Sequence, residues 1–182
     1  MEELKNMASN GNSHNKQNRI LRAKWMDYRS PSIMMVTIVT TKRLPLLGKL
    51  QGENIILTEL GQKVAEEIKR IPTYNGAESI EIYSYVIMPD HVHILLHIHE
   101  HLPRHVGYYI RWFKKQCTNI GLALAVPSAS DHSPLFAPDY HDRILKGKNQ
   151  LSHMVRYIQD NPRRLALKHA NKDLFRIRQN QL

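Results

Sequence analysis

The chain has 182 residues, 42% hydrophobic and 23% charged, which is enough for one ordinary folded domain. Its 26 Lys and Arg against 16 Asp and Glu give a formal net charge of +10, which makes nucleic acid the first partner to consider. No run approaches the ~18 consecutive apolar residues of a membrane span, no apolar leader is visible, and the single cysteine, Cys117, excludes an internal disulfide. We therefore expect a cytoplasmic protein that does not bind membranes and is stabilised by packing.

Composition divides the chain into three parts. Residues 1–30 are rich in Asn, Lys and Arg and are expected to form a flexible basic arm, although the residues near Tyr28 are candidates for packing. Residues 31–170 are expected to fold as one domain, and residues 171–182 as a basic tail.

The first half of the domain alternates strand and helix signals. The β-branched run 32–41 predicts a central strand, and a loop with Pro and Gly follows it. Thr58 is a suitable N-cap for a helix whose apolar stripe is ended by Pro72. Residues 79–88 and 91–99 then predict two strands of a hairpin, joined by the Pro89-Asp90 turn.

The second half continues this alternation. A helix of about 18 residues is expected from Pro103 to Gly121, followed by a long loop over 122–138 and a strand over 140–145. A last helix is expected over 149–160, with Asp160 or Asn161 capping a further helix that begins at Pro162. The order β-α-β-β-α-β plus a helix predicts an α+β, ferredoxin-like sandwich: an antiparallel sheet with helices on one face and a C-terminal helix.

The strand over 91–99 carries a histidine at every second position except one. Because alternate side chains share a face, His91 and His93 lie on the face opposite the apolar Val92 and Ile94. Two imidazoles at this spacing can bind one metal ion. A His-x-His pair alone is weak evidence, since solvated histidines on a sheet face give the same pattern.

A second group of histidines follows, at positions 97, 99, 101 and 105. It is compatible with a second metal site, with a pH-sensitive surface or with a solvated edge of the sheet. The sequence does not decide among these three.

The last helix places His153, Tyr157 and Asn161 four residues apart and so on one face. Tyr157 could be an ordinary packing residue, and Asn161 an ordinary cap. If they belong with the histidines, the chemistry is attack of a tyrosine oxygen on a DNA phosphodiester. A phenol with a pKa of ~10 needs the help of a metal ion at neutral pH; magnesium or manganese suits this role, although imidazoles also accept zinc or nickel.

Three strings carry a resemblance to a known family. Tyr85-Val86-Ile87-Met88-Pro89-Asp90-His91-Val92-His93-Ile94-Leu95-Leu96 is followed by Tyr140-His141-Asp142-Arg143-Ile144-Leu145 and then by Tyr157-Ile158-Gln159-Asp160-Asn161-Pro162. In this order the motifs resemble the single-tyrosine HUH transposases of insertion sequences, and most of all their REP-associated branch. The resemblance covers roughly residues 32–167.

The resemblance implies a ferredoxin-like fold, a metal ion bound by His91 and His93, and Tyr157 as nucleophile. Asn161 occupies the place of a further metal ligand. The implied substrate is single-stranded DNA beside a hairpin, cut to leave a 5′-phosphotyrosine and a free 3′-hydroxyl. The turn before the first histidine usually carries Asn in this family, whereas this chain has Asp90.

Cations and one aromatic residue suggest where DNA binds. We expect the contacts to come from Arg104, Arg111, Trp112, Lys114 and Lys115 on the second helix and from Arg163 and Arg164 near the C-terminus. Trp112 could equally belong to the core.

Two other functions fit the same residues. One is a catalytically silent DNA- or RNA-hairpin-binding regulator, and the other is a metal-dependent phosphoesterase that uses water in place of the tyrosine. The sequence leaves open whether the protein is a monomer or a homodimer, and whether Tyr157 acts in its own chain.

Overall fold

The structure is a computed structural model and describes residues 26–126 and 133–171. Most of the expected basic arm and nearly all of the expected tail lie outside these residues, so the three-part division of the chain stays a prediction. Tyr28, at the start of the described chain, is buried in the core.

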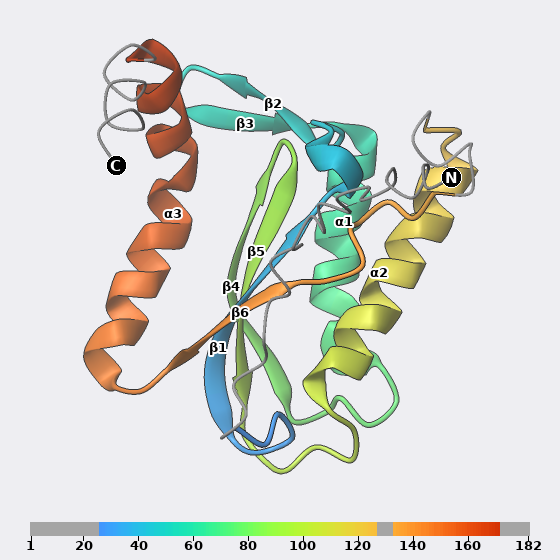
Figure 1. Cartoon of the computed structure of the whole chain (residues 1–182), viewed down its shortest axis with the longest axis vertical. Helices are drawn as coiled ribbons and strands as arrows, with labels where there is room; N and C mark the ends of the chain where they lie inside the picture. The colour runs from blue at the N-terminus through green and yellow to red at the C-terminus, as the bar shows by residue number, and fades with distance from the viewer. Residues whose placement is uncertain (1–25, 127–132, 172–182) are drawn as a thin grey trace, which may run out of the picture.

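One antiparallel sheet forms the centre of the domain (Figure 1). Its strands are β1 (Ser32–Val39), β4 (Ile80–Met88), β5 (His91–Ile98) and β6 (His141–Leu145). The spatial order is β4-β5-β1-β6, and each neighbouring pair is antiparallel. This arrangement confirms the predicted ferredoxin-like sandwich, with β5 and β1 in the interior of the sheet.

Two helices cover one face of the sheet. They are α1 (Glu59–Arg70) and α2 (Val106–Ala123), which lie side by side in Figure 1. The main core lies beneath them, where Val92, Ile94, Leu96 and Ile98 of β5 are buried. The alternation predicted for β5 is therefore confirmed for its apolar face.

The third helix, α3 (Lys148–Ala170), packs on the opposite face (Figure 1). Its Met154 and Ile158 form a second apolar cluster with Met35 of β1 and Leu95 of β5. The predicted break at Asn161 is wrong, because Pro162 lies inside this one helix. Contacts with β2 and β3 extend the packing of α3, which offsets the hydrogen bond that Pro162 cannot make.

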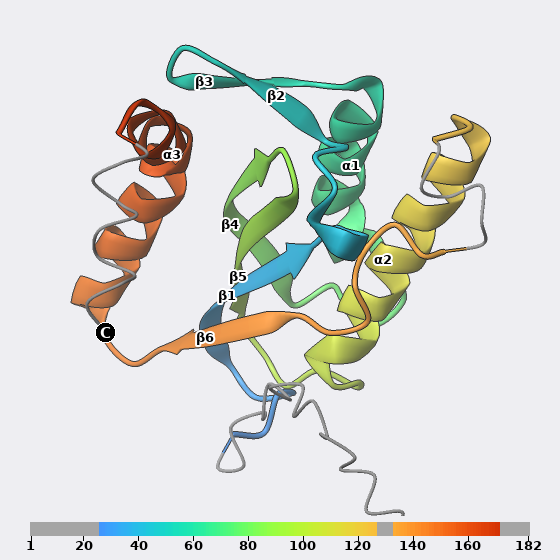
Figure 2. The same cartoon turned by 45° about the horizontal axis from the view of Figure 1, so that its top comes forward.

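A short hairpin was not expected in the loop after β1. It consists of β2 (Gly48–Gln51) and β3 (Asn54–Leu57), and Gly52 at its turn has a φ of 59°. Figure 2 shows the hairpin reaching from α1 towards the end of α3. Each strand has only four residues, and the three apolar residues of β3 are consecutive, so neither strand gives a clear alternation in the sequence.

The helix boundaries depend on local caps. The Thr58 hydroxyl accepts a hydrogen bond from the Gly61 amide, as predicted for the start of α1. The start of α2 lies three residues after Pro103, because the His105 ring accepts from the Gly107 amide and caps the helix there. Two 3-10 turns, Thr41–Arg43 and Ile71–Thr73, complete the elements. Within the described chain, no helix has both the length and the apolar character needed to cross a membrane.

Candidate functional site

His91 and His93 stand at the start of β5, on the face that α3 covers. Their ring centroids are 4.8 Å apart in an edge-to-face arrangement. His93 is only 6% exposed, whereas His91 lies at the margin of the sheet and is more accessible. The pair therefore has one inner and one outer imidazole.

Each ring is held through its Nδ1 atom. The Nδ1 of His93 lies 2.8 Å from the hydroxyl of Thr37, which pairs with His93 across β1 and β5. The Nδ1 of His91 lies 2.6 Å from a carboxylate oxygen of Asp90. Among the described residues no hydrogen bond occupies either Nε2 atom. When the proton is on Nδ1, both Nε2 atoms can bind a metal ion, and the Nδ1 contacts fix the ring orientations.

The electrostatics of the pair favour a neutral imidazole at His93, the inner position. Burial, together with the neighbouring His91, lowers the pKa of His93 from its ordinary value of 6.5 to about 4. Burial acts to raise the pKa of Asp90, but hydrogen bonds from His91 and Arg43 outweigh it and the pKa is lowered. At neutral pH the site thus holds a neutral His93 and an ionised Asp90, which lies 3.3 Å from the Arg43 guanidinium. This donor set fits a divalent cation.

Tyr157 extends from α3 towards these histidines. Its ring centroid lies 5.6 Å from that of His93, edge to face. The Arg164 guanidinium lies 5.1 Å from the centroid of the same tyrosine ring. The surface of α3 is hollowed around Tyr157, and His153, Arg156 and Arg163 line this hollow with it. The tyrosine is therefore next to both the histidine pair and a basic, open surface.

Asn161 is buried one helical turn after Tyr157, with 8% exposure. Its side-chain nitrogen donates to the Tyr157 carbonyl oxygen at 2.7 Å. This bond fixes the amide and leaves its oxygen as the atom suited to a hard cation. The third metal ligand stays a prediction.

The residues expected to bind DNA fall on two sides of the molecule. Arg163 and Arg164 are on α3, beside Tyr157, and Arg163 lies 3.8 Å from Glu53 at the β2–β3 turn. Arg104, Arg111, Trp112, Lys114 and Lys115 belong to α2 or the segment before it, on the other face of the sheet. The structure does not bring these two groups together.

The α2 residues nevertheless form a surface of their own. Arg104, Arg111 and Lys114 line a hollow with Tyr108 and Tyr140. Trp112 is 42% exposed, so it is not a core residue, and the Lys115 ammonium lies 5.7 Å from its ring centroid. The Lys114 ammonium donates to the carbonyl of Pro138 at 2.7 Å.

Sequence reasoning did not identify how three residues position the site. Two of them, Thr37 and Arg43, were not considered as residues of the site, and for Asp90 the hydrogen bond to His91 was not foreseen. Only Asp90 had a local signal, because it precedes His91. Thr37 could be found only from the register of β1 on β5.

The other histidines separate into groups. His97 and His99, with Glu81 of β4, form a cluster at the opposite end of β5. His101 is paired with Asp27 instead, at 3.4 Å, and His105 caps α2.

Comparison with known proteins connects this geometry to a family. The profile of the family described as "Transposase IS200 like" matches residues 53–161, which include β5 and most of α3 up to Asn161. An uncharacterised protein of Haemophilus influenzae is 24% identical over 159 residues, 79% of this chain and 87% of that protein. The solved structure of the REP-associated tyrosine transposase bound to a REP hairpin is similar in fold, with a TM-score of 0.56, 19% identity and coverage of 79% of this chain and 74% of that chain.

Proposed function

This chain belongs to the IS200-like transposase family, and from that premise we propose that it nicks and rejoins single-stranded, hairpin-associated DNA through a phosphotyrosine at Tyr157, with a divalent metal ion as cofactor. The observation that carries the proposal is the meeting of β5 and α3, where the rings of His93 and Tyr157 lie side by side. These residues are far apart in the sequence, and each has an ordinary structural explanation when it is considered alone. Their proximity favours one chemical site over two unrelated packing residues.

The reaction is a reversible exchange of phosphodiester bonds. The Tyr157 oxygen attacks phosphorus, forming a bond to the 5′-phosphate, while the bond from phosphorus to the 3′-oxygen breaks. The phenolic proton leaves to solvent, and the departing 3′-oxygen takes up a proton to become a hydroxyl. Attack of a 3′-hydroxyl on the phosphotyrosine reverses these steps and joins the strand, so no external energy source is needed.

The surrounding residues have separate roles in this reaction. A metal ion bound by His91, His93 and the Asn161 oxygen would polarise the scissile phosphate; magnesium or manganese suits such a site when phosphate oxygens complete the ligand set. Thr37 and Asp90 hold the two imidazoles with Nε2 available. Arg164, beside the tyrosine ring, stabilises the negative charge of the phenolate and of the phosphate.

We assign Tyr157 to the site of its own chain. The contact between Tyr157 and His93 lies within one chain, which supports a tyrosine acting in cis. Arg163 and Arg164 are suited to hold the strand next to the cleaved bond. The α2 cations, on the far face, are suited to hold a more distant part of the DNA, such as a hairpin stem.

The test is a denaturing gel of the purified protein with labelled single-stranded hairpin libraries and manganese or magnesium. We expect a covalent protein–DNA adduct with the wild type and none with Tyr157→Phe or His91→Ala. Tyr83→Phe is the matched control, because Tyr83 is 48% exposed on β4 and outside the site. Arg164→Gln is expected to reduce the adduct while DNA binding in a native gel persists.

Two outcomes contradict the proposal. Nicking that continues unchanged in Tyr157→Phe would identify water as the nucleophile and a phosphoesterase as the activity. Hairpin binding with no adduct, although metal is bound, would identify a silent binding protein. Mixing Tyr157→Phe with His91→Ala separates cis from trans action, since restored adduct formation in the mixture would show that the tyrosine acts in a partner's site.

A further inference from the structure

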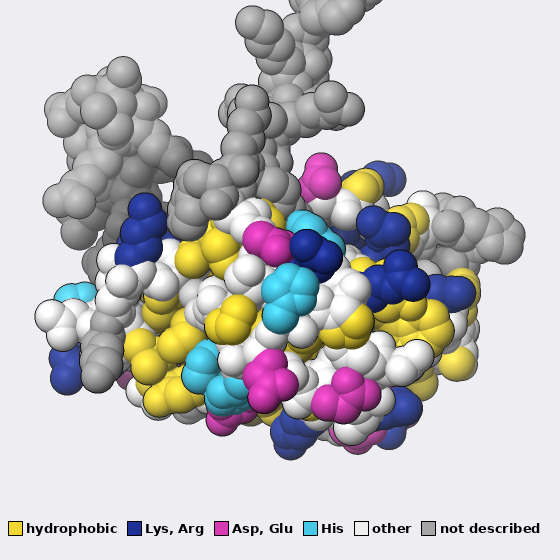
Figure 3. Space-filling model, turned by 90° about the horizontal axis from the view of Figure 1, so that it is seen from below, with side chains coloured by type: hydrophobic (Ala, Val, Ile, Leu, Met, Phe, Trp, Pro, Cys, Tyr) yellow, Lys and Arg dark blue, Asp and Glu magenta, His cyan; other side chains and the backbone are white. Residues whose placement is uncertain are grey.

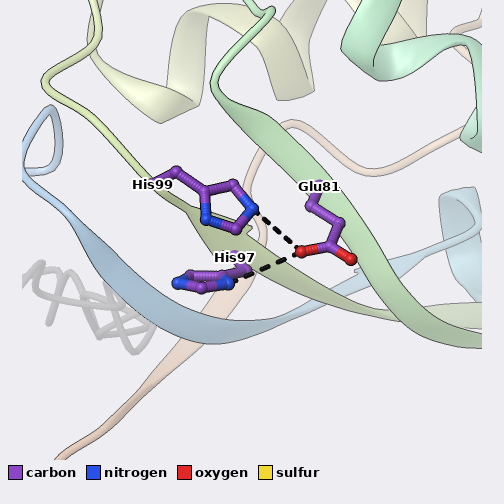
Figure 4. A group of neighbouring side chains, drawn as sticks. All are labelled: Glu81, His97 and His99. Atoms are coloured by element: carbon purple, nitrogen blue, oxygen red, sulfur yellow. Dashed lines mark hydrogen bonds and ion pairs between the residues drawn. The ribbon is translucent and has the colours of Figure 1, made fainter.

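A second group of possible ligands lies at the other end of β5 from His91. It consists of His97, His99 and Glu81, and Figure 4 shows the three side chains converging from β4 and from the end of β5. Viewed from this end, the surface of the molecule carries several histidine and acidic side chains (Figure 3). The cluster is open to solvent, with side-chain exposures of 32% for His97, 48% for His99 and 51% for Glu81.

The ligand atoms lie within the reach of one ion. The Glu81 carboxylate oxygen Oε2 is 2.9 Å from Nε2 of His99 and 3.6 Å from Nδ1 of His97. All three ligand atoms lie within 4.8 Å of one another. Bonds of about 2.0–2.1 Å to zinc in a tetrahedron place neighbouring ligand atoms about 3.3 Å apart. The two distances from Glu81 lie on either side of that value, and the two histidine nitrogens are within 4.8 Å of each other, so the three atoms are close to the spacing that one ion requires.

The backbone under this cluster is held in place. Glu81 pairs with His97 across β4 and β5, so the two side chains are neighbours on the same face of the sheet. The His99 amide donates to the Ser79 carbonyl oxygen at 2.9 Å, which fixes the chain just beyond the end of β5. Three ligands on a paired hairpin cost little conformational entropy when they bind an ion.

The cluster is separate from the site at His91 and His93. Even the nearer ligand, His93, is four residue steps of extended strand away from His97, which is roughly 13 Å. No single ion can bridge that distance, and the packed side chains of Leu95 and Met35 lie between the two ends. Each end of β5 therefore presents its own set of ligands.

We propose that Glu81, His97 and His99 form a second metal site, which takes a late first-row divalent ion such as Zn²⁺, Co²⁺ or Ni²⁺. Two imidazole nitrogens and one carboxylate oxygen suit these ions and are a poor match for Mg²⁺, which prefers oxygen ligands. Solvent access leaves room for water to complete the coordination shell. A bound ion would join the start of β4 to the end of β5 and stabilise the folded sheet, independently of any nicking activity.

The test uses the tag-free full chain with Zn²⁺ as the titrant. His91→Ala removes the accessible ligand of the first site without altering the buried His93, and so provides the background. In this background we expect one equivalent of zinc by calorimetry and a higher melting temperature with zinc than with chelator. His99→Ala and Glu81→Gln are each expected to weaken this binding at least about tenfold. His101→Ala is the control, because His101 is close in sequence but paired with Asp27.

A histidine side-chain ¹H–¹⁵N spectrum identifies the ligands directly. We expect zinc to shift the Nδ1 signal of His97 and the Nε2 signal of His99, the two atoms that face Glu81. Failure of the background variant to bind zinc would overturn the proposal. Binding that His99→Ala and Glu81→Gln leave unchanged would also overturn it, because the zinc would then be held elsewhere.

Discussion

The low pKa of His93 predicts how acid affects the stability of the metal-free protein. The pKa is about 4 in the folded chain, against 6.5 for an ordinary histidine. At a pH between these two pKa values, the unfolded chain therefore binds a proton at His93 and the folded chain does not. The contribution of this group to the free energy of unfolding is fully present above pH 6.5. It is lost as the pH falls towards 4, and the whole loss is about 3 kcal/mol.

The assay is urea unfolding followed by circular dichroism at pH 7, 5.5 and 4.5, with a chelator present to keep metal from the site. His93→Gln cannot be protonated, so we expect its free energy of unfolding to fall less steeply over this range than that of the wild type. His153→Gln is the control, because it removes a histidine of α3 whose side chain is exposed in the folded chain. The wild type and His93→Gln differ in slope because burial penalises the charged form of the imidazole at position 93.

Equal slopes for the wild type and His93→Gln would refute this reasoning. They would mean that the pKa of His93 is the same in the folded and the unfolded chain, so that burial does not hold this imidazole neutral below pH 6.5.

Two further predictions concern the residues that shape the site and the fold. Thr37→Val removes the hydroxyl that holds Nδ1 of His93 and should weaken Mn²⁺ binding by about 10–100-fold, as measured by calorimetry. The control is Thr73→Val, which is expected to leave the affinity unchanged. Unchanged affinity in Thr37→Val as well would show that Thr37 does not orient the ring. Gly61→Ala places a Cβ against the Leu47 carbonyl oxygen and should lower the free energy of unfolding in urea by about 1–3 kcal/mol. Gly147→Ala is the control, because its Cβ meets no atom within 4 Å and should not destabilise the fold. Equal stability of the two variants would contradict the packing of α1 against the segment around Leu47.

Signals that are local in the sequence predicted much of this structure. The alternation of apolar residues and histidines in β5 predicted both its buried face and the position of His91 and His93 on the other. The helical spacing of α3 and the cap at Thr58 were likewise readable, because each depends on residues within one or two turns. The paired motifs then related β5 to α3, which periodicity alone could not do.

Features that depend on tertiary contacts could not be predicted. Local geometry before Pro162 argued for a helix break, but packing of α3 against the sheet and the β2–β3 hairpin keeps the helix continuous. The same limit applies to the α2 cations. Their spacing in the sequence shows that they are on one helix, but it does not show which face of the sheet this helix covers. Glu81 and the two distant histidines needed the register of β4 on β5.

The middle of β5 is packed on both faces of the sheet. Leu95 is buried beneath α3, while Ile94 and Leu96 on either side of it are buried beneath α1 and α2. Since β5 is also paired with β4 and β1, its position is fixed both within the sheet and between the two layers of helices. The contact of Leu95 with Met154 and Ile158 sets the distance of α3 from the sheet, and Tyr157 lies between these two residues in the sequence. The separation of the tyrosine from His93 is therefore determined by core packing, which places the two residues proposed to react next to each other in the folded chain itself.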